Sequence, residues 1–99
     1  MHESPYIGLT RIELMPDITI YTKSSCGYCH AAKELLKRKN AAFNEISVDS
    51  DPALQEQMAK RANGRRTVPQ IFIGERHIGG CDDLYGLDNA GKLDPLLAA

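Results

Sequence analysis

From residue 16 onward, apolar and polar positions along the chain follow two different periods. Short apolar or alternating runs predict strands over residues 17–22, 43–48, 70–73 and 76–78. Apolar residues that recur every three to four positions predict helices over residues 27–40 and 53–62, and one or two further helical segments over 82–87 and 91–97. The element order is therefore β-α-β-α-β-β-α.

This order indicates the fold class. A strand–helix–strand unit forces a right-handed parallel crossover, whereas the turn at Gly74-Glu75 predicts a hairpin and hence antiparallel strands. The sequence therefore predicts an α/β fold in which helices cover both faces of one four-stranded mixed sheet.

Residues 1–15 lack this patterning. We interpret them as a flexible N-terminal extension to a single domain that spans residues 16–99. Residues 1–14 contain no continuous apolar run of the kind that an export signal requires, so we expect the chain to remain inside the cell.

Composition narrows the expected partners. A net charge of −1 gives no bulk field that would attract nucleic acid or an anionic membrane surface. No segment approaches the roughly 20 apolar residues of a transmembrane helix. The three cysteines are an odd number, which argues against a disulfide framework and fits a reducing compartment. We therefore expect a cytoplasmic protein with neither nucleic acid nor membrane as a partner.

The tetrapeptide Cys26-Gly27-Tyr28-Cys29 lies where the first predicted strand gives way to the first predicted helix. A Cys-x-x-Cys at such a junction is typical of a redox-active dithiol. The N-terminal turn of a helix presents unpaired N–H groups and the positive end of the dipole, and Lys23 adds to that field. We therefore predict that Cys26 is the nucleophile and that Cys29, one turn further in, is the resolving thiol.

Three other interpretations of these cysteines stay open. With His30, the motif matches a c-type haem attachment site, which normally requires export. Cys26, Cys29, Cys81 and His77 would make a Cys₃His zinc set, although paired ligand knuckles are lacking. The two cysteines also fit an ordinary helix without function. The strand-to-helix placement favours the redox interpretation over all three.

Thr67-Val68-Pro69 is a candidate binding segment, because it directly precedes a predicted strand. A trans proline would simply end a loop there. A cis bond would instead leave the N–H and C=O groups of Val68 free to pair with an extended peptide.

Gly79-Gly80 and the residues after it form a second candidate segment. Two glycines permit close approach of a ligand to the backbone, and the N–H groups of a starting helix can hold a carboxylate. Asp82 and Asp83 suit a helix N-cap, and a cap residue can also bind a ligand's ammonium group.

Two cations are available for a second carboxylate. We predict that Lys23 and Arg65 are free for this role. Alternatively, Arg65 and Arg66 are solvated loop charges.

Taken together in this order and spacing, these motifs resemble those of the glutaredoxin family, most closely the small bacterial glutaredoxin 3 type. The resemblance runs from about residue 17 to residue 97 and rests on residues 21–23, the Cys26-x-Tyr28-Cys29 motif, and residues 67–73 and 77–84. It implies the thioredoxin-like fold and glutathione-dependent reduction of protein disulfides and of glutathione mixed disulfides. Glutathione and disulfide-containing or glutathionylated client proteins are the implied partners.

The resemblance also implies a glutathione site. Pro69 would be cis, so that Val68 pairs with the cysteinyl backbone of the tripeptide. Cations would face the glycyl carboxylate, and an aromatic ring would flank the ligand. The segment that begins at Gly79-Gly80 would hold the γ-glutamyl end. The implied residues are Lys23, Tyr28, Arg65, Thr67, Val68, Pro69, Gly80, Cys81 and Asp82.

One position departs from the family pattern, because Gly27 replaces the proline that usually stands between Cys26 and Tyr28. Glutaredoxins lacking this proline include members that assemble a [2Fe-2S] cluster between two protomers with two glutathiones. The alternative function is therefore a cluster-binding homodimer with Cys26 as a ligand, either in place of the monomeric catalyst or as an additional state of it. Cys81 is either partly exposed and glutathionylated or a small buried residue.

Overall fold

The computed structural model describes residues 16–98, so the predicted N-terminal extension at 1–15 lies outside the described residues. The elements in chain order are β1 (Ile18–Thr22), α2 (Gly27–Arg38), β2 (Asn44–Ser47), α3 (Pro52–Arg61), β3 (Gln70–Ile73), β4 (Arg76–Gly79), α4 (Cys81–Asn89) and α5 (Leu93–Leu97). Within residues 16–98, no helix has both the length and the apolar character needed to cross a membrane.

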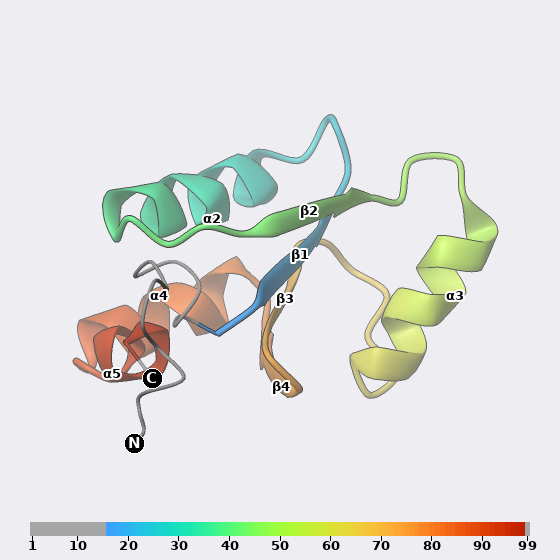
Figure 1. Ribbon diagram of the computed structural model, residues 1–99. Helices are drawn as coiled ribbons and strands as arrows, with labels where there is room; N and C mark the ends of the chain where they lie inside the picture. Colours follow the sequence, from blue (N-terminus) through green and yellow to red (C-terminus); the bar gives the residue numbers. More distant parts are fainter. Residues whose placement is uncertain (1–15, 99) are drawn as a thin grey trace, which may run out of the picture.

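The strands form the predicted mixed sheet, in the order β2-β1-β3-β4 (Figure 1). β1 and β2 are parallel, and α2 makes the crossover between them. β3 is antiparallel to both β1 and β4, as the hairpin signal predicts. This pairing brings the end of β1, which leads into Cys26, next to the start of β3, which follows Pro69.

Helices cover both faces of the sheet, as predicted. α2, α4 and α5 lie on one side and α3 on the other (Figure 1). The alternation along β1 explains this arrangement, since Ile18 and Ile20 join the core cluster under α2 and α4. Tyr21 points the other way and packs with Met58 of α3. Two apolar cores therefore hold the sheet between its helices.

The helix boundaries follow local chemistry. α2 ends at Arg38, earlier than the predicted Asn40, because Asn40 adopts the left-handed conformation with φ 57° and reverses the chain. α3 begins at Pro52, one residue before the predicted start, because the Asp51 carboxylate caps the helix by accepting a hydrogen bond from the Leu54 N–H at 3.1 Å.

Candidate active site

Cys26 is the N-cap residue of α2, which confirms its predicted place at the start of the helix. Its Sγ accepts a hydrogen bond from the Cys29 N–H at 3.1 Å and donates one to the Val68 carbonyl at 3.6 Å. The residue is half-buried. The sulfur therefore meets both an amide of the first helical turn and the backbone of the Thr67-Val68-Pro69 segment.

Cys29 lies one turn into α2 and is fully buried. Burial is the main cause that raises the pKa of its thiol to about 12, and the hydrogen bond with the Cys26 side chain adds to the effect. Its thiol is therefore protonated at neutral pH. Cys26 is therefore the more exposed of the two cysteines.

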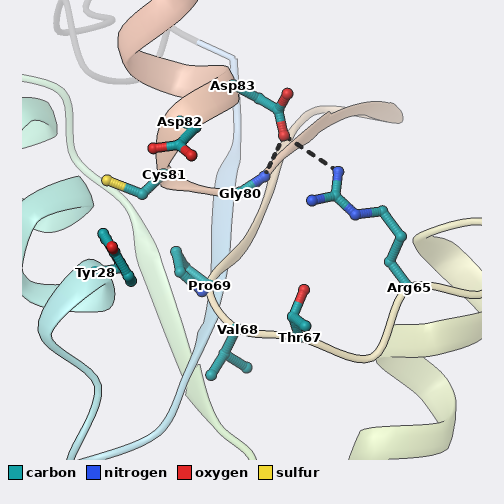
Figure 2. Close-up of a pocket in the computed structure, with 9 residues that line it drawn as sticks. All are labelled: Tyr28, Arg65, Thr67, Val68, Pro69, Gly80, Cys81, Asp82 and Asp83. Carbon is teal, nitrogen blue, oxygen red and sulfur yellow. Dashed lines mark hydrogen bonds and ion pairs between the residues drawn. The ribbon is translucent and has the colours of Figure 1, made fainter.

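A pocket of about 310 Å³ is lined by Val68, whose carbonyl is the hydrogen-bond partner of the Cys26 sulfur (Figure 2). It lies between the segment at residues 65–69, the start of α4 and the ring of Tyr28, which is 68% exposed. Its lining residues are Tyr28, Arg65, Thr67, Val68, Pro69, Gly80, Cys81, Asp82 and Asp83. The fold therefore gathers eight of the nine predicted glutathione residues around one cavity.

The ninth, Lys23, does not line the pocket. Its carbonyl accepts a hydrogen bond from the Cys26 N–H at 3.2 Å. Hydrogen bonds from Ser24 lower the pKa of the Asp49 carboxyl, and the positive charge of Lys23 makes a smaller contribution in the same direction. The Lys23 ammonium thus acts on Asp49.

Arg65 is not the free cation that the sequence suggested. Its Nη1 pairs with Oδ2 of Asp83 at 3.1 Å, and the same oxygen accepts the Gly80 N–H at 2.8 Å (Figure 2). This amide, followed by the Arg65 guanidinium, lowers the pKa of Asp83. Arg66 is also paired, with Glu56 at 2.7 Å. Arg65 and Asp83 are 18 positions apart, so the local sequence pattern could not predict their contact.

The start of α4 differs from the prediction as well. The N-cap is Gly80, which has no side chain to cap with, so neither Asp82 nor Asp83 occupies that position. Asp83 instead reaches back from the third helical position to the Gly80 N–H. An acidic residue three positions after the N-cap is the sequence signal for the contact between Asp83 and the Gly80 N–H. This signal could have identified Asp83 as a residue of the site.

The Val68–Pro69 peptide bond is cis, as the resemblance implies. Behind it, the fully buried Gln70 donates from Nε2 to the Thr67 carbonyl at 3.0 Å and to its hydroxyl at 3.3 Å. Gln70 Oε1 lies 2.7 Å from His77 Nε2 on β4. Within residues 16–98, no hydrogen bond from the Val68 N–H is found.

Comparison with known proteins decides the family. The family model described as Glutaredoxin matches residues 18–78. The chain is 60% identical over 80 residues to a probable glutaredoxin of Synechocystis, covering 81% of this chain and 91% of that protein. It is 58% identical over 83 residues to glutaredoxin 3 of Escherichia coli K12, covering 84% of this chain and 99% of that protein.

The chain belongs to the glutaredoxin family. It is thus a glutathione-dependent disulfide oxidoreductase of the glutaredoxin 3 type. The solution structure of glutaredoxin from Brucella melitensis superposes with a TM-score of 0.75 at 56% identity, covering 85% of this chain and 90% of that one. A buckwheat glutaredoxin–glutathione complex gives 0.75 at 36% identity, covering 88% and 80%.

Cys81 of this glutaredoxin is buried, at 8% exposure, although it lines the pocket. Burial is the main cause that raises the pKa of its thiol, with further contributions from the charges of Asp82 and Cys26. This environment favours the small-buried-residue interpretation over the exposed, glutathionylated one. Between residues 16 and 98, no three His, Cys, Asp or Glu side chains come together as a metal site.

Gly27 occupies the first position of α2 and has open space where a Cβ would stand. The donor to the Cys26 sulfur is the N–H of Cys29, so a proline at 27 would remove no bond to the thiol. Cys26, at φ −97° and ψ 110°, has the extended backbone that a residue before proline prefers.

We therefore expect Gly27→Pro to stabilise this glutaredoxin by about 0.4–1 kcal/mol, because it restricts the unfolded chain. Urea unfolding measures the change. The same substitution at Gly86, inside α4, should destabilise by about 3 kcal/mol. Destabilisation by Gly27→Pro would show that the first turn needs the freedom of glycine.

His77 gives the fold a pH dependence. Gln70 offers its carbonyl to Nε2, while the amide of Asn63 lies 3.5 Å from Nδ1, and both contacts suit a neutral ring. Burial is the first cause that lowers the pKa of His77, and the charge of Arg65 is the second. A lowered folded-state pKa means that the unfolded chain binds the proton more readily.

The contribution of His77 to stability is therefore complete above its unfolded pKa of about 6.5 and is lost as pH falls through the lower folded-state value. Melting temperatures of wild type and His77→Gln at pH 7.5 and pH 5.0 test this. We expect wild type to lose more between the two pH values. Equal losses would assign the acid sensitivity to other groups.

Proposed function

We propose that this glutaredoxin reduces protein disulfides and glutathione mixed disulfides through Cys26, with glutathione held in the pocket beside it. The main observation in support of this function is that Val68, the hydrogen-bond partner of the Cys26 sulfur, also lines that pocket. The solved complex of a buckwheat glutaredoxin with glutathione supports the choice of ligand.

The lining suits the parts of the tripeptide. The Val68 backbone can pair with the cysteinyl backbone as an added strand would, and this pairing would bring the glutathione sulfur toward Cys26, which is hydrogen-bonded to the Val68 carbonyl. Arg65 is the cation for the glycyl carboxylate, since Lys23 stands outside the lining. The N–H groups at the start of α4 and the Asp82 carboxylate then serve the γ-glutamyl carboxylate and ammonium.

For a glutathionylated client, the Cys26 thiolate attacks the glutathione sulfur. The Cys26–glutathione disulfide forms, the old S–S bond breaks, and the client thiolate leaves and takes a proton from solvent. A second glutathione thiolate then attacks the bound glutathione sulfur. This releases oxidised glutathione and returns Cys26 as a thiolate, and the Cys29 N–H stabilises the anionic sulfur at the helix start.

For a protein disulfide, the Cys26 thiolate attacks one of the two sulfurs and forms a mixed disulfide with the client. The Cys29 thiolate attacks the Cys26 sulfur, so the Cys26–Cys29 bond forms and the client leaves with both of its thiols. Two glutathiones then reduce the internal disulfide. Cys29 is therefore the resolving thiol of this dithiol route and is not needed in the monothiol route.

A deglutathionylation assay tests the proposal. We expect the rate on a glutathionylated peptide to depend on reduced glutathione and to fall sharply when an equal concentration of 2-mercaptoethanol replaces it. Mass spectrometry should find one glutathione on Cys26 in the Cys29→Ser variant. An equal rate with both thiols, or glutathione on Cys81 alone, would overturn the assignment.

A [2Fe-2S] cluster is the second candidate. Cys26 is the only cysteine among residues 16–98 that is not buried, so each chain offers one thiolate and a cluster would need two chains and two glutathione sulfurs. A similar solved structure, 54% identical to this chain and described as "Metal Binding of Glutaredoxins", supports this candidate. Visible absorbance and a dimer after anaerobic purification, both lost in Cys26→Ser, would support it.

A colourless monomer with full exchange activity would instead rule out the cluster-binding dimer and leave catalysis as the single function. For that state we propose a cytoplasmic monomer, and the odd number of cysteines fits the reducing compartment that this location implies.

A further inference from the structure

A polar cluster lies under the first turns of α2, where the sheet is otherwise apolar. The residues of β1 that face α2 are Ile18, Ile20 and then Thr22, which is buried although it is polar. Glu45 of β2 stands opposite Ile20 in the parallel register and so belongs to the same edge of this face. The cluster is completed by Lys33 of α2.

One carboxylate oxygen holds the cluster together. Glu45 Oε2 accepts the Thr22 hydroxyl at 2.7 Å and the Lys33 ammonium at 3.0 Å. These two hydrogen bonds lower the pKa of Glu45, with Thr22 the larger cause. The Lys33 side chain is only 18% exposed, so its charge is fixed against the protein and is not free in solvent.

Lys33 and Cys29 lie on the same face of α2. Lys33 follows Cys29 by four positions on α2, a spacing that places two side chains on one helical face as neighbours. Two influences oppose the burial that raises the pKa of the Cys29 thiol: a backbone hydrogen bond with Lys23 is the larger, and the charge of Lys33 is the smaller. Other titratable groups nearby are Cys26, which raises the pKa of Cys29, Cys81 of α4, and His30, whose charge acts on Glu45.

We propose that Lys33, anchored by Glu45 and Thr22, is a positioning residue for the resolving step: it places a positive charge where the Cys29 thiolate forms. The proposal rests on the dithiol route described above. There, Cys29 must lose its proton, its thiolate must attack Cys26, and the client sulfur must leave as a thiolate that takes up a proton. The ammonium keeps its own proton throughout and lowers the energy of the anion beside it.

Lys33 should therefore matter for one route only. In the monothiol route glutathione attacks from outside and Cys29 stays protonated, so the charge beside it has no anion to stabilise. A residue that only supported the fold would affect both routes alike, because both use the same Cys26 and the same pocket.

Stopped-flow reaction of the reduced protein with a disulfide-bonded fluorescent peptide, without glutathione, separates the two steps. We expect Lys33→Met to leave the first phase, attack by Cys26, unchanged. The second phase, release by Cys29, should slow by about three- to tenfold, because loss of the charge reduces the thiolate fraction more than it raises nucleophilicity. The pH profile of that phase should move to higher pH.

Three variants serve as controls. Lys33→Arg keeps the charge and should restore the second phase, and Lys37→Met removes an exposed charge one turn further along α2 and should leave it unchanged. Lys33→Met/Glu45→Gln removes both charges, so it lacks the unpaired carboxylate that would destabilise the single variant. The second phase should nevertheless remain slow. Recovery of the rate together with the melting temperature in this double variant would overturn the proposal.

The outcomes also separate this proposal from the function beneath it. If Cys29→Ser released the peptide as fast as wild type, Cys29 would not be the resolving thiol and the dithiol route itself would fail. If Cys29→Ser lost the second phase while Lys33→Met kept it at the wild-type rate, only the role of Lys33 would fail.

Discussion

Cys26→Ser is expected to lower the rate of both deglutathionylation and protein disulfide reduction by about a thousandfold or more. The hydroxyl of serine is a far weaker nucleophile than a thiolate, and Cys29 cannot replace the lost sulfur because it is fully buried and its thiol pKa is about 12. Assays on a glutathionylated peptide and on a protein disulfide, each with excess glutathione, measure the two rates.

Cys29→Ser is the matched variant, with the same change of one atom three positions away. It should keep deglutathionylation within a few-fold of wild type and lose most of the glutathione-independent reduction of a protein disulfide, because only that reaction uses the second thiol. Far-UV circular dichroism checks that both variants fold. Equal loss of deglutathionylation in the two variants would contradict the assigned roles.

Gly79→Ala is expected to destabilise the fold by about 3 kcal/mol and to raise the KM for glutathione by about two- to fivefold. Gly79 has φ 117°, a backbone conformation that side chains rarely adopt. A Cβ there would also clash with the carboxylate of Asp83 and lie 2.9 Å from Arg65 Nη1. The pair at the mouth of the pocket would have to move, and with it the charge offered to the ligand.

Gly91→Ala separates the two causes. Gly91 also has a positive φ, 72°, but a Cβ there would meet nothing within 4 Å. We expect it to cost about 1–2 kcal/mol in urea unfolding and to leave the KM for glutathione unchanged. A Gly79→Ala variant that matched Gly91→Ala in both measurements would show that the contact with Asp83 is unimportant.

Much of the fold was predictable because each element depends on residues close in sequence. The alternation in β1, the Pro52 start of α3 and the glycine turn before β4 are local signals, and the crossover rule then orders the strands. An observed helix boundary differs from the predicted one where the conformation of a single residue ends the helix. Asn40 is such a residue, and its left-handed conformation ends α2 two positions before the predicted end.

The candidate site was less predictable wherever a side chain finds its partner across the fold. Lys23 and Arg65 looked equivalent as cations near the motif, yet one acts on Asp49 and the other is paired with Asp83. Gln70 looked like a strand residue, and only the packing of β3 against β4 brings it to both Thr67 and His77. Side-chain partners of this kind depend on three-dimensional distance, which a periodic pattern does not encode.

The Arg65–Asp83 pair has a kinetic consequence. Because Arg65 already has a carboxylate beside it, an arriving ligand exchanges one ion pair for another and does not fill a vacant charge. Both side chains are about half exposed, so this exchange takes place in contact with water, where such pairs contribute little net free energy. Glutathione should consequently have a short residence time, which lets each product leave before the next nucleophile arrives.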